Sequence, residues 1–176
     1  MNILLAFAPF FAFAVVSHLA GISAGLAAGA VSALLLVGRD ALAGRRAKWL
    51  EIGTTVLFGA LALYALRMQP AWSLAQVRLL VDCGLLAIVL GSMLARMPFT
   101  LQYAYESVAP EFWQRPEFIR KNYVITGVWA AAFAAMVLAD LVMQTRQGAG
   151  VLMTVLAITC AVKFTQRYAG RVSAAN

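Results

Sequence analysis

The sequence predicts an all-α fold: a polytopic transmembrane bundle of six helices, with a short amphipathic helix at the membrane interface between spans four and five. Apolar residues make up 63% of the 176 residues, charged residues make up only 12%, and the mean hydropathy is +0.84. A soluble domain carries about 25% charged residues, so this much apolar surface needs lipid as its solvent. The apolar runs do not alternate with polar residues, and a helix satisfies its own backbone groups in lipid.

Six apolar runs are read as spans, at residues 3–18, 21–37, 50–66, 79–95, 123–143 and 149–165. A helix rises about 1.5 Å per residue and needs roughly 20 residues to cross the hydrocarbon core. The shorter runs reach this length if flanking aromatic residues and arginines complete the crossing. No linker or low-complexity tract divides the chain, so a single integral membrane domain over residues 1–176 is expected.

The first run begins MNILLAFAPFFAFAVV and has no basic residue before it. A secretory signal peptide normally has a positively charged leader, so this run is predicted to be retained as the first helix. Pro9 lies inside the run. It predicts a kink in the helix, or a tolerated proline whose freed carbonyl finds a neighbouring donor.

The long connection 96–122 has apolar residues at helical spacing, namely Leu101, Ala104, Tyr105 and Val108. Pro98 suits the first turn of such a helix, and Pro110 is expected to end it. We expect this short helix to lie on the membrane interface, although a plain amphipathic connector would show the same pattern. The Arg115-Pro116-Glu117 segment predicts the start of the next helix, with an acid in its first turn.

Lysines and arginines are distributed unequally between the two sides of the predicted bundle. Eleven fall on the side of the termini: Arg39, Arg45, Arg46, Lys48, Arg96, Arg115, Arg120, Lys121, Lys163, Arg167 and Arg171. Three fall on the other side: Arg67, Arg78 and Arg146. Cytoplasmic loops carry the excess of basic residues, so both termini are predicted to be cytoplasmic. The net charge of +7 therefore reflects membrane orientation, and nucleic acid is not an expected partner.

Small residues recur every fourth position in two of the spans. Gly21, Gly25 and Gly29 form one row, which Ala33 extends, and Gly127, Ala131, Ala135 and Ala139 form another. Rows of small residues let helix backbones approach closely in lipid. They predict close helix packing, either inside the bundle or between two copies of the chain. Membrane lipids, further copies of the chain and other membrane proteins are the expected partners.

Ionisable residues inside spans are costly, and they often mark a functional site. Four occur here: Glu51, Asp82, Asp140 and Lys163. Glu51 is close to Lys48, while Asp82 and Asp140 approach the outer face with Arg78, which can pair with Asp82 along one helix face, and with Arg146. Locally paired, snorkelling charges explain this pattern. The alternative is a polar path built around Asp82 and Asp140, as in a small transporter or channel.

Motifs of known catalytic sites are missing from the sequence. It has no HExxH, GxSxG, Walker glycine loop or CxxC pattern. Its only histidine is His18, and its two cysteines, Cys83 and Cys160, lie in apolar runs as small buried residues would. We therefore expect no enzyme activity, no metal site and no cofactor.

Several local patterns together resemble those of the intracellular septation protein A family of small bacterial inner-membrane proteins. They are Pro9-Phe10-Phe11 in the first span, Lys48 and Glu51 before the LFGALALY segment, Arg78 after a loop with Trp72, Arg96-Met97-Pro98, and Trp129 with Phe133. The resemblance covers roughly residues 3–140, and the segment 98–118 departs from it. It implies a non-enzymatic protein of the bacterial inner membrane with a role in the cell envelope or in division.

Overall fold

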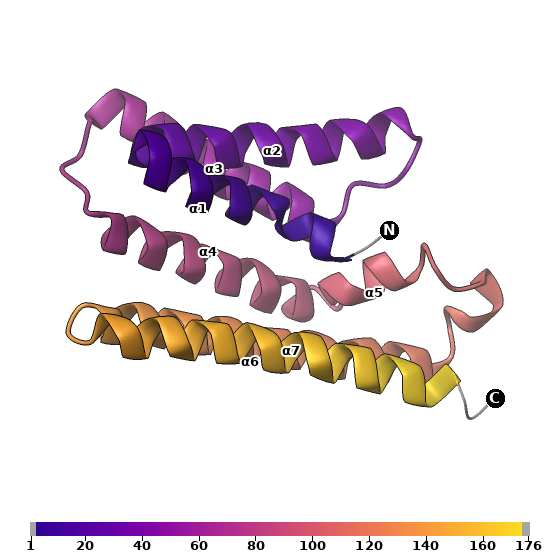
Figure 1. Ribbon diagram of the computed structural model, residues 1–176. Coiled ribbons are helices and arrows are strands. Elements are labelled where there is room, and N and C mark those ends of the chain that lie inside the picture. Colours follow the sequence, from indigo (N-terminus) through magenta and orange to yellow (C-terminus); the bar gives the residue numbers. More distant parts are fainter. Residues whose placement is uncertain (1–2, 174–176) are drawn as a thin grey trace. The chain divides into compact units, whose positions relative to one another are not determined.

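The structure is a computed structural model that describes the backbone of residues 3–173 and the side chains of residues 5–168. Every regular element in this part of the chain is a helix (Figure 1). The chain forms two compact units, Met1–Ile88 and Val89–Asn176, and each is described by itself. The expectation of a single membrane domain over residues 1–176 stays a prediction.

The elements follow one another as helices joined by short connections. The first unit contains the 3₁₀ helix η1 (Ile3–Phe7), α1 (Ala8–Ala20), α2 (Ile22–Leu42), α3 (Trp49–Met68) and most of α4 (Leu74–Leu94). The second unit contains the end of α4, α5 (Phe99–Ala104), the 3₁₀ helix η2 (Pro110–Phe112), α6 (Pro116–Met143) and α7 (Gln147–Ser173).

Five of the helices in the described part, α2, α3, α4, α6 and α7, are long and apolar enough to cross a membrane. The prediction of an all-α fold is thereby confirmed for the described residues, and these five helices are those expected of a protein embedded in a membrane. Large apolar side chains such as Leu35, Val56 and Leu152 are exposed on these helices, as expected of surfaces that face lipid. The sixth predicted span is not confirmed, because the remaining apolar helix, Leu5–Ala20, is shorter than the five.

The first predicted span is divided at its proline. Residues Ile3–Phe7 form a 3₁₀ helix, and α1 begins at Ala8 with Pro9 in its first turn. Proline has no N–H to donate, and its ring clashes with the carbonyl four residues earlier, so it is tolerated in a first turn and not in a helix interior. Pro9 therefore lies at the beginning of α1 and not in the interior of one continuous α-helix, and the kink in the first span stays a prediction.

Four helices of the first unit share one apolar core. It consists of Phe13 from α1, Leu26 from α2, Phe58, Ala62 and Ala65 from α3, and Val77 and Val81 from α4. Phe58 is fully buried at its centre, with its ring 5.7 Å from that of Phe13 and 5.2 Å from that of Phe10. The Trp49 indole N–H on α3 also donates to the Ile88 carbonyl on α4 at 3.0 Å.

The helix in the connection 96–122 is shorter than predicted, and it contacts α6. Helix α5 ends at Ala104, well before Pro110, which begins η2 instead. The Thr100 hydroxyl of α5 donates to the Asn122 carbonyl of α6 at 2.9 Å and lies 2.7 Å from the Thr126 hydroxyl. Thus α5 is held on α6 by buried polar contacts, and its position at a membrane interface stays a prediction.

Helices α6 and α7 form an antiparallel pair in the second unit (Figure 1). Helix α6 begins at Pro116 with Glu117 in its first turn, at the start expected from the sequence. A Cβ atom at Gly150 of α7 would lie 2.7 Å from the Ala139 carbonyl oxygen of α6, so the two backbones touch there. Further along the pair, the Trp129 indole N–H donates to the Thr165 hydroxyl at 3.1 Å.

Candidate functional site: a buried ion cluster

The residues of the candidate site lie where α2 ends and α3 begins. Asp40 lies in the last turn of α2, Lys48 directly precedes α3, and Glu51 lies in the first turn of α3. The turn between the helices depends on Gly44, whose φ of +66° is in the left-handed region that glycine adopts without a Cβ clash. The Gly44 N–H donates to the Ala41 carbonyl and the Arg45 N–H to the Asp40 carbonyl, the pattern of a Schellman motif.

This turn brings five charged side chains together, and we call Arg39, Asp40, Arg45, Lys48 and Glu51 the Asp40 cluster. Asp40 Oδ1 accepts from Arg39 Nε at 3.1 Å and from Arg39 Nη2 at 2.8 Å, and it lies 3.9 Å from Arg45 Nη1. Asp40 Oδ2 accepts from Lys48 Nζ. The same Nζ lies 3.5 Å from Glu51 Oε1. One lysine therefore bridges two carboxylates from two helices.

The three residues at the centre of the cluster are buried inside the protein. Asp40, Lys48 and Glu51 are 0%, 3% and 1% exposed, whereas the side chains of Arg39 and Arg45 are 39% and 49% exposed. Transferring a charge from water to a protein interior costs several kcal/mol unless close opposite charges and hydrogen bonds offset the cost. The arrangement therefore acts as an ionic link that fixes the end of α2 to the start of α3.

Sequence reasoning placed Lys48 near Glu51 but missed Asp40, Arg39 and Arg45 as parts of a site. These residues fall in a basic segment at a helix end, which by itself indicates only membrane orientation. The available signal was Asp40 itself, the only acid between residues 38 and 49.

The predicted polar cluster of Arg78, Asp82, Asp140 and Arg146 is divided between the two units. In the first unit, Asp82 is 8% exposed on α4, and Arg78 is half-buried one turn earlier on the same helix. In the second unit, Asp140 is 3% exposed on α6, and Arg146 is exposed in the turn before α7. The gathering of these four side chains at one place stays a prediction.

The glycine row of α2 contacts two neighbouring helices of the first unit. A Cβ atom at Gly25 would collide with the Ser17 hydroxyl of α1, and one at Gly29 would lie 2.6 Å from the Phe58 ring of α3. Gly21 differs, because nothing lies within 4 Å of the position of its Cβ atom. Its φ of +89° instead forms the turn between α1 and α2, so the expectation of a close helix contact at Gly21 is wrong.

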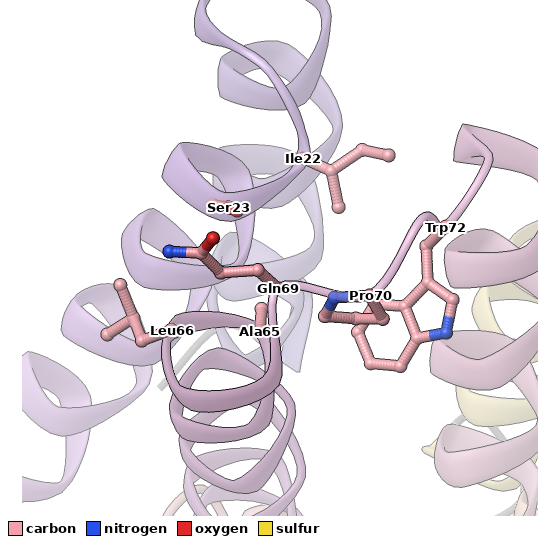
Figure 2. Close-up of a pocket in the computed structure, with 7 residues that line it drawn as sticks. All are labelled: Ile22, Ser23, Ala65, Leu66, Gln69, Pro70 and Trp72. Carbon is pink, nitrogen blue, oxygen red and sulfur yellow. The ribbon is translucent and has the colours of Figure 1, made fainter.

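A pocket of about 280 Å³ lies at the opposite end of α2 and α3 from the Asp40 cluster. Its lining residues are Ile22, Ser23, Ala65, Leu66, Gln69, Pro70 and Trp72 (Figure 2). Gln69 ends α3 with a φ of +42°, and the Trp72 ring stacks on Tyr64 at a centroid distance of 5.2 Å. Pockets that bind drug-sized molecules usually measure about 300–1,000 Å³, so this one is a weaker candidate than the Asp40 cluster.

The described residues hold no group of three or more histidine, cysteine, aspartate and glutamate side chains placed to bind a metal ion. Cys83 and Cys160 are both exposed, which corrects the expectation that they are buried. They lie on apolar helices, where an exposed thiol faces lipid as a small apolar group would.

No protein-family model, curated protein or solved structure matches the chain. The resemblance to the intracellular septation protein A family therefore stays a prediction.

Proposed function

We propose that this chain is a non-enzymatic, six-span protein of the bacterial inner membrane that acts in envelope maintenance or division by packing with lipids and with other membrane proteins or its own copies. Five long apolar helices support the membrane location. Helix α1, preceded by η1, supplies the sixth crossing if the bilayer thins locally around it. The envelope role follows from the family resemblance described above.

The observation that carries the non-enzymatic proposal is the pairing inside the Asp40 cluster. Lys48 is bound by Asp40 and lies beside Glu51, and Asp40 is also bound by Arg39. A lysine that acts as a nucleophile must be able to lose its proton and reach a substrate. Lys48 is 3% exposed and lies between two carboxylates, so it is suited to linking helices.

The orientation has both termini in the cytoplasm, as the basic residues predict. Single cysteines at Ser73 and at Ala47, both exposed positions, report on the two sides of the membrane. The parent for labelling carries Cys83→Ala and Cys160→Ala, because both native thiols are exposed. An impermeant maleimide applied to intact spheroplasts is expected to label Ser73→Cys and to label Ala47→Cys only after permeabilisation. Labelling of Ala47→Cys from outside would overturn the orientation.

A second candidate function is transport along a polar path near Asp82 and Asp140. The burial of both carboxylates in long apolar helices favours it, because ionisable residues inside membrane helices often line ion or substrate pathways.

One complementation experiment distinguishes the two functions. Deletion of the gene in its host is expected to increase detergent sensitivity or cell length. The wild-type gene is expected to reverse whichever of these changes occurs. A variant with Asp82→Asn and Asp140→Asn, matched to wild type in membrane level, should also reverse the change if the protein works through packing. Failure of this variant, together with loss of ion or substrate flux in proteoliposomes, would establish transport instead.

A further inference from the structure

Two polar side chains line the pocket at the ends of α2 and α3, and neither forms a hydrogen bond with any described residue. They are the Ser23 hydroxyl, in the first turn of α2, and the Gln69 carboxamide, at the end of α3. Figure 2 shows the carboxamide extending toward Ser23, with the Trp72 ring on the other side of the Gln69 backbone. A hydroxyl and a carboxamide can each donate and accept hydrogen bonds. The pocket therefore offers a ligand both kinds of hydrogen bond.

Gln69 ends α3 in a backbone conformation that glutamine rarely adopts. Its φ of +42° and ψ of +50° lie in the left-handed region, where glycine has no Cβ clash and usually ends helices. The Gln69 N–H caps α3 by donating to the Ala65 carbonyl at 3.1 Å, a bond that glycine would also make. Residues held in such conformations gather at ligand sites, where the side chain is needed despite its cost to stability. At this position glutamine adds the carboxamide.

The pocket is uncharged and small. None of its seven lining residues is an acid, a lysine, an arginine or a histidine. A charge that loses water without gaining a charged partner is costly, so the lining favours an uncharged ligand. The volume of about 280 Å³ is below the range of about 300–1,000 Å³ that encloses drug-sized molecules. A large ligand therefore binds here through a small part of its structure and leaves the rest outside.

Apolar surface of the kind that faces lipid adjoins the pocket. Leu66 lines the pocket and is 65% exposed, and Leu63, nearly one turn earlier on α3, is 63% exposed. Trp72 stacks on Tyr64, and both residue types are enriched where a membrane meets water. Helices α2 and α3 are each long enough to cross a membrane, and the pocket lies at their ends. This is the depth of the glycerol and ester groups of a surrounding bilayer.

We propose that this pocket binds the headgroup of an uncharged glycerolipid, a diacylglycerol, whose acyl chains lie in the bilayer beside α3. The free hydroxyl of a diacylglycerol donates and accepts hydrogen bonds, and its ester carbonyls accept them. The Gln69 carboxamide and the Ser23 hydroxyl supply the matching groups. A phospholipid would instead bring a charged phosphate against an uncharged lining. The site is separate from the Asp40 cluster and does not depend on the proposed role in the envelope.

Photolabelling of the purified full-length protein tests the site. The probe is a diacylglycerol with a diazirine at the ester end of one acyl chain, added to micelles of a non-ionic detergent. Irradiation is expected to label peptides that contain residues 22–23 or 65–72, and unlabelled dioleoylglycerol is expected to compete. Phosphatidylglycerol should need a concentration about tenfold higher for the same competition. Labelling that avoids both segments, or equal competition by phosphatidylglycerol, would overturn the proposal.

Gln69→Gly separates lipid binding from stability, because the two effects have opposite signs. Glycine relieves the left-handed backbone, so the melting temperature without lipid is expected to rise by roughly 2–4 °C. Loss of the carboxamide should weaken dioleoylglycerol competition by about tenfold. Ser23→Ala removes only the hydroxyl at an exposed position, and it should weaken competition by about fivefold without lowering the melting temperature.

Gln144→Gly is the matched control, because it makes the same change at the end of α6. Gln144 is exposed and has a φ of −65°, so glycine relieves nothing there. This variant should melt at or slightly below the wild-type temperature and should bind the probe as wild type does. Wild-type binding by Gln69→Gly would show that the carboxamide plays no part and would overturn the site. Weaker binding together with a lower melting temperature would assign Gln69 to the fold and overturn it as well.

Discussion

Lys48→Met is expected to lower the free energy of unfolding by roughly 3–5 kcal/mol, because removing one partner of a buried ion pair leaves an uncompensated charge. Lys48 is 3% exposed, binds Asp40 and lies 3.5 Å from Glu51. Methionine is similar in length and apolar, so the loss comes from the charge and not from a cavity. The measurement is reversible unfolding of the purified protein in mixed micelles.

Lys163→Met is the matched control, because it makes the same chemical change at an exposed position of α7. It should change the free energy of unfolding by less than about 0.5 kcal/mol. A double-mutant cycle of Lys48→Met with Asp40→Asn should show strong coupling between the two sites. Additive effects in this cycle would mean that the lysine and the aspartate act independently, and this result would contradict the ion pair between them.

The pairing of charges in the Asp40 cluster could not be predicted from the sequence of this chain. Hydropathy alone located the long helices, because a run of apolar residues has few alternatives in lipid. Asp40 and Lys48 are eight residues apart and become partners only because the turn at Gly44 reverses the chain. The turn itself is a local motif, but the pairing of these side chains depends on the packing of α2 against α3. Along the sequence the same residues look like a solvated basic connection.

The helix in the connection 96–122 is shorter than predicted, and its position at the membrane interface stays a prediction for a related reason. Its apolar spacing was correct for a helix, but a spacing does not say what covers the apolar face. Thr100 and Leu101 are 4% and 5% exposed, and Thr100 bonds to two residues of α6. Tyr105, directly after the helix, also contacts the Phe118 ring of α6 at a centroid distance of 5.9 Å, so protein of the second unit covers part of this face.

Gly25→Ala is expected to destabilise the protein by about 1–3 kcal/mol, the usual cost of overpacking. A Cβ atom there would collide with the Ser17 hydroxyl and would lie 2.9 Å from both the Phe13 carbonyl oxygen and Ser17 Cα. The hydroxyl can rotate away, but the two backbone atoms belong to α1 and cannot move without displacing the helix. The substitution therefore pushes α1 and α2 apart along their length.

Gly38→Ala provides the control within the same helix, because nothing lies within 4 Å of its Cβ position. Alanine in a helix interior is favoured over glycine by about 1 kcal/mol, so this variant should be as stable as wild type or more stable. Thermal unfolding of both variants in detergent tests the contrast, and the oligomeric state is measured in parallel. If Gly25→Ala melted as Gly38→Ala does while the oligomeric state changed, the glycine row would act between copies of the chain. Destabilisation with an unchanged oligomeric state would place its role inside the first unit, as its contacts with Ser17 and Phe58 indicate.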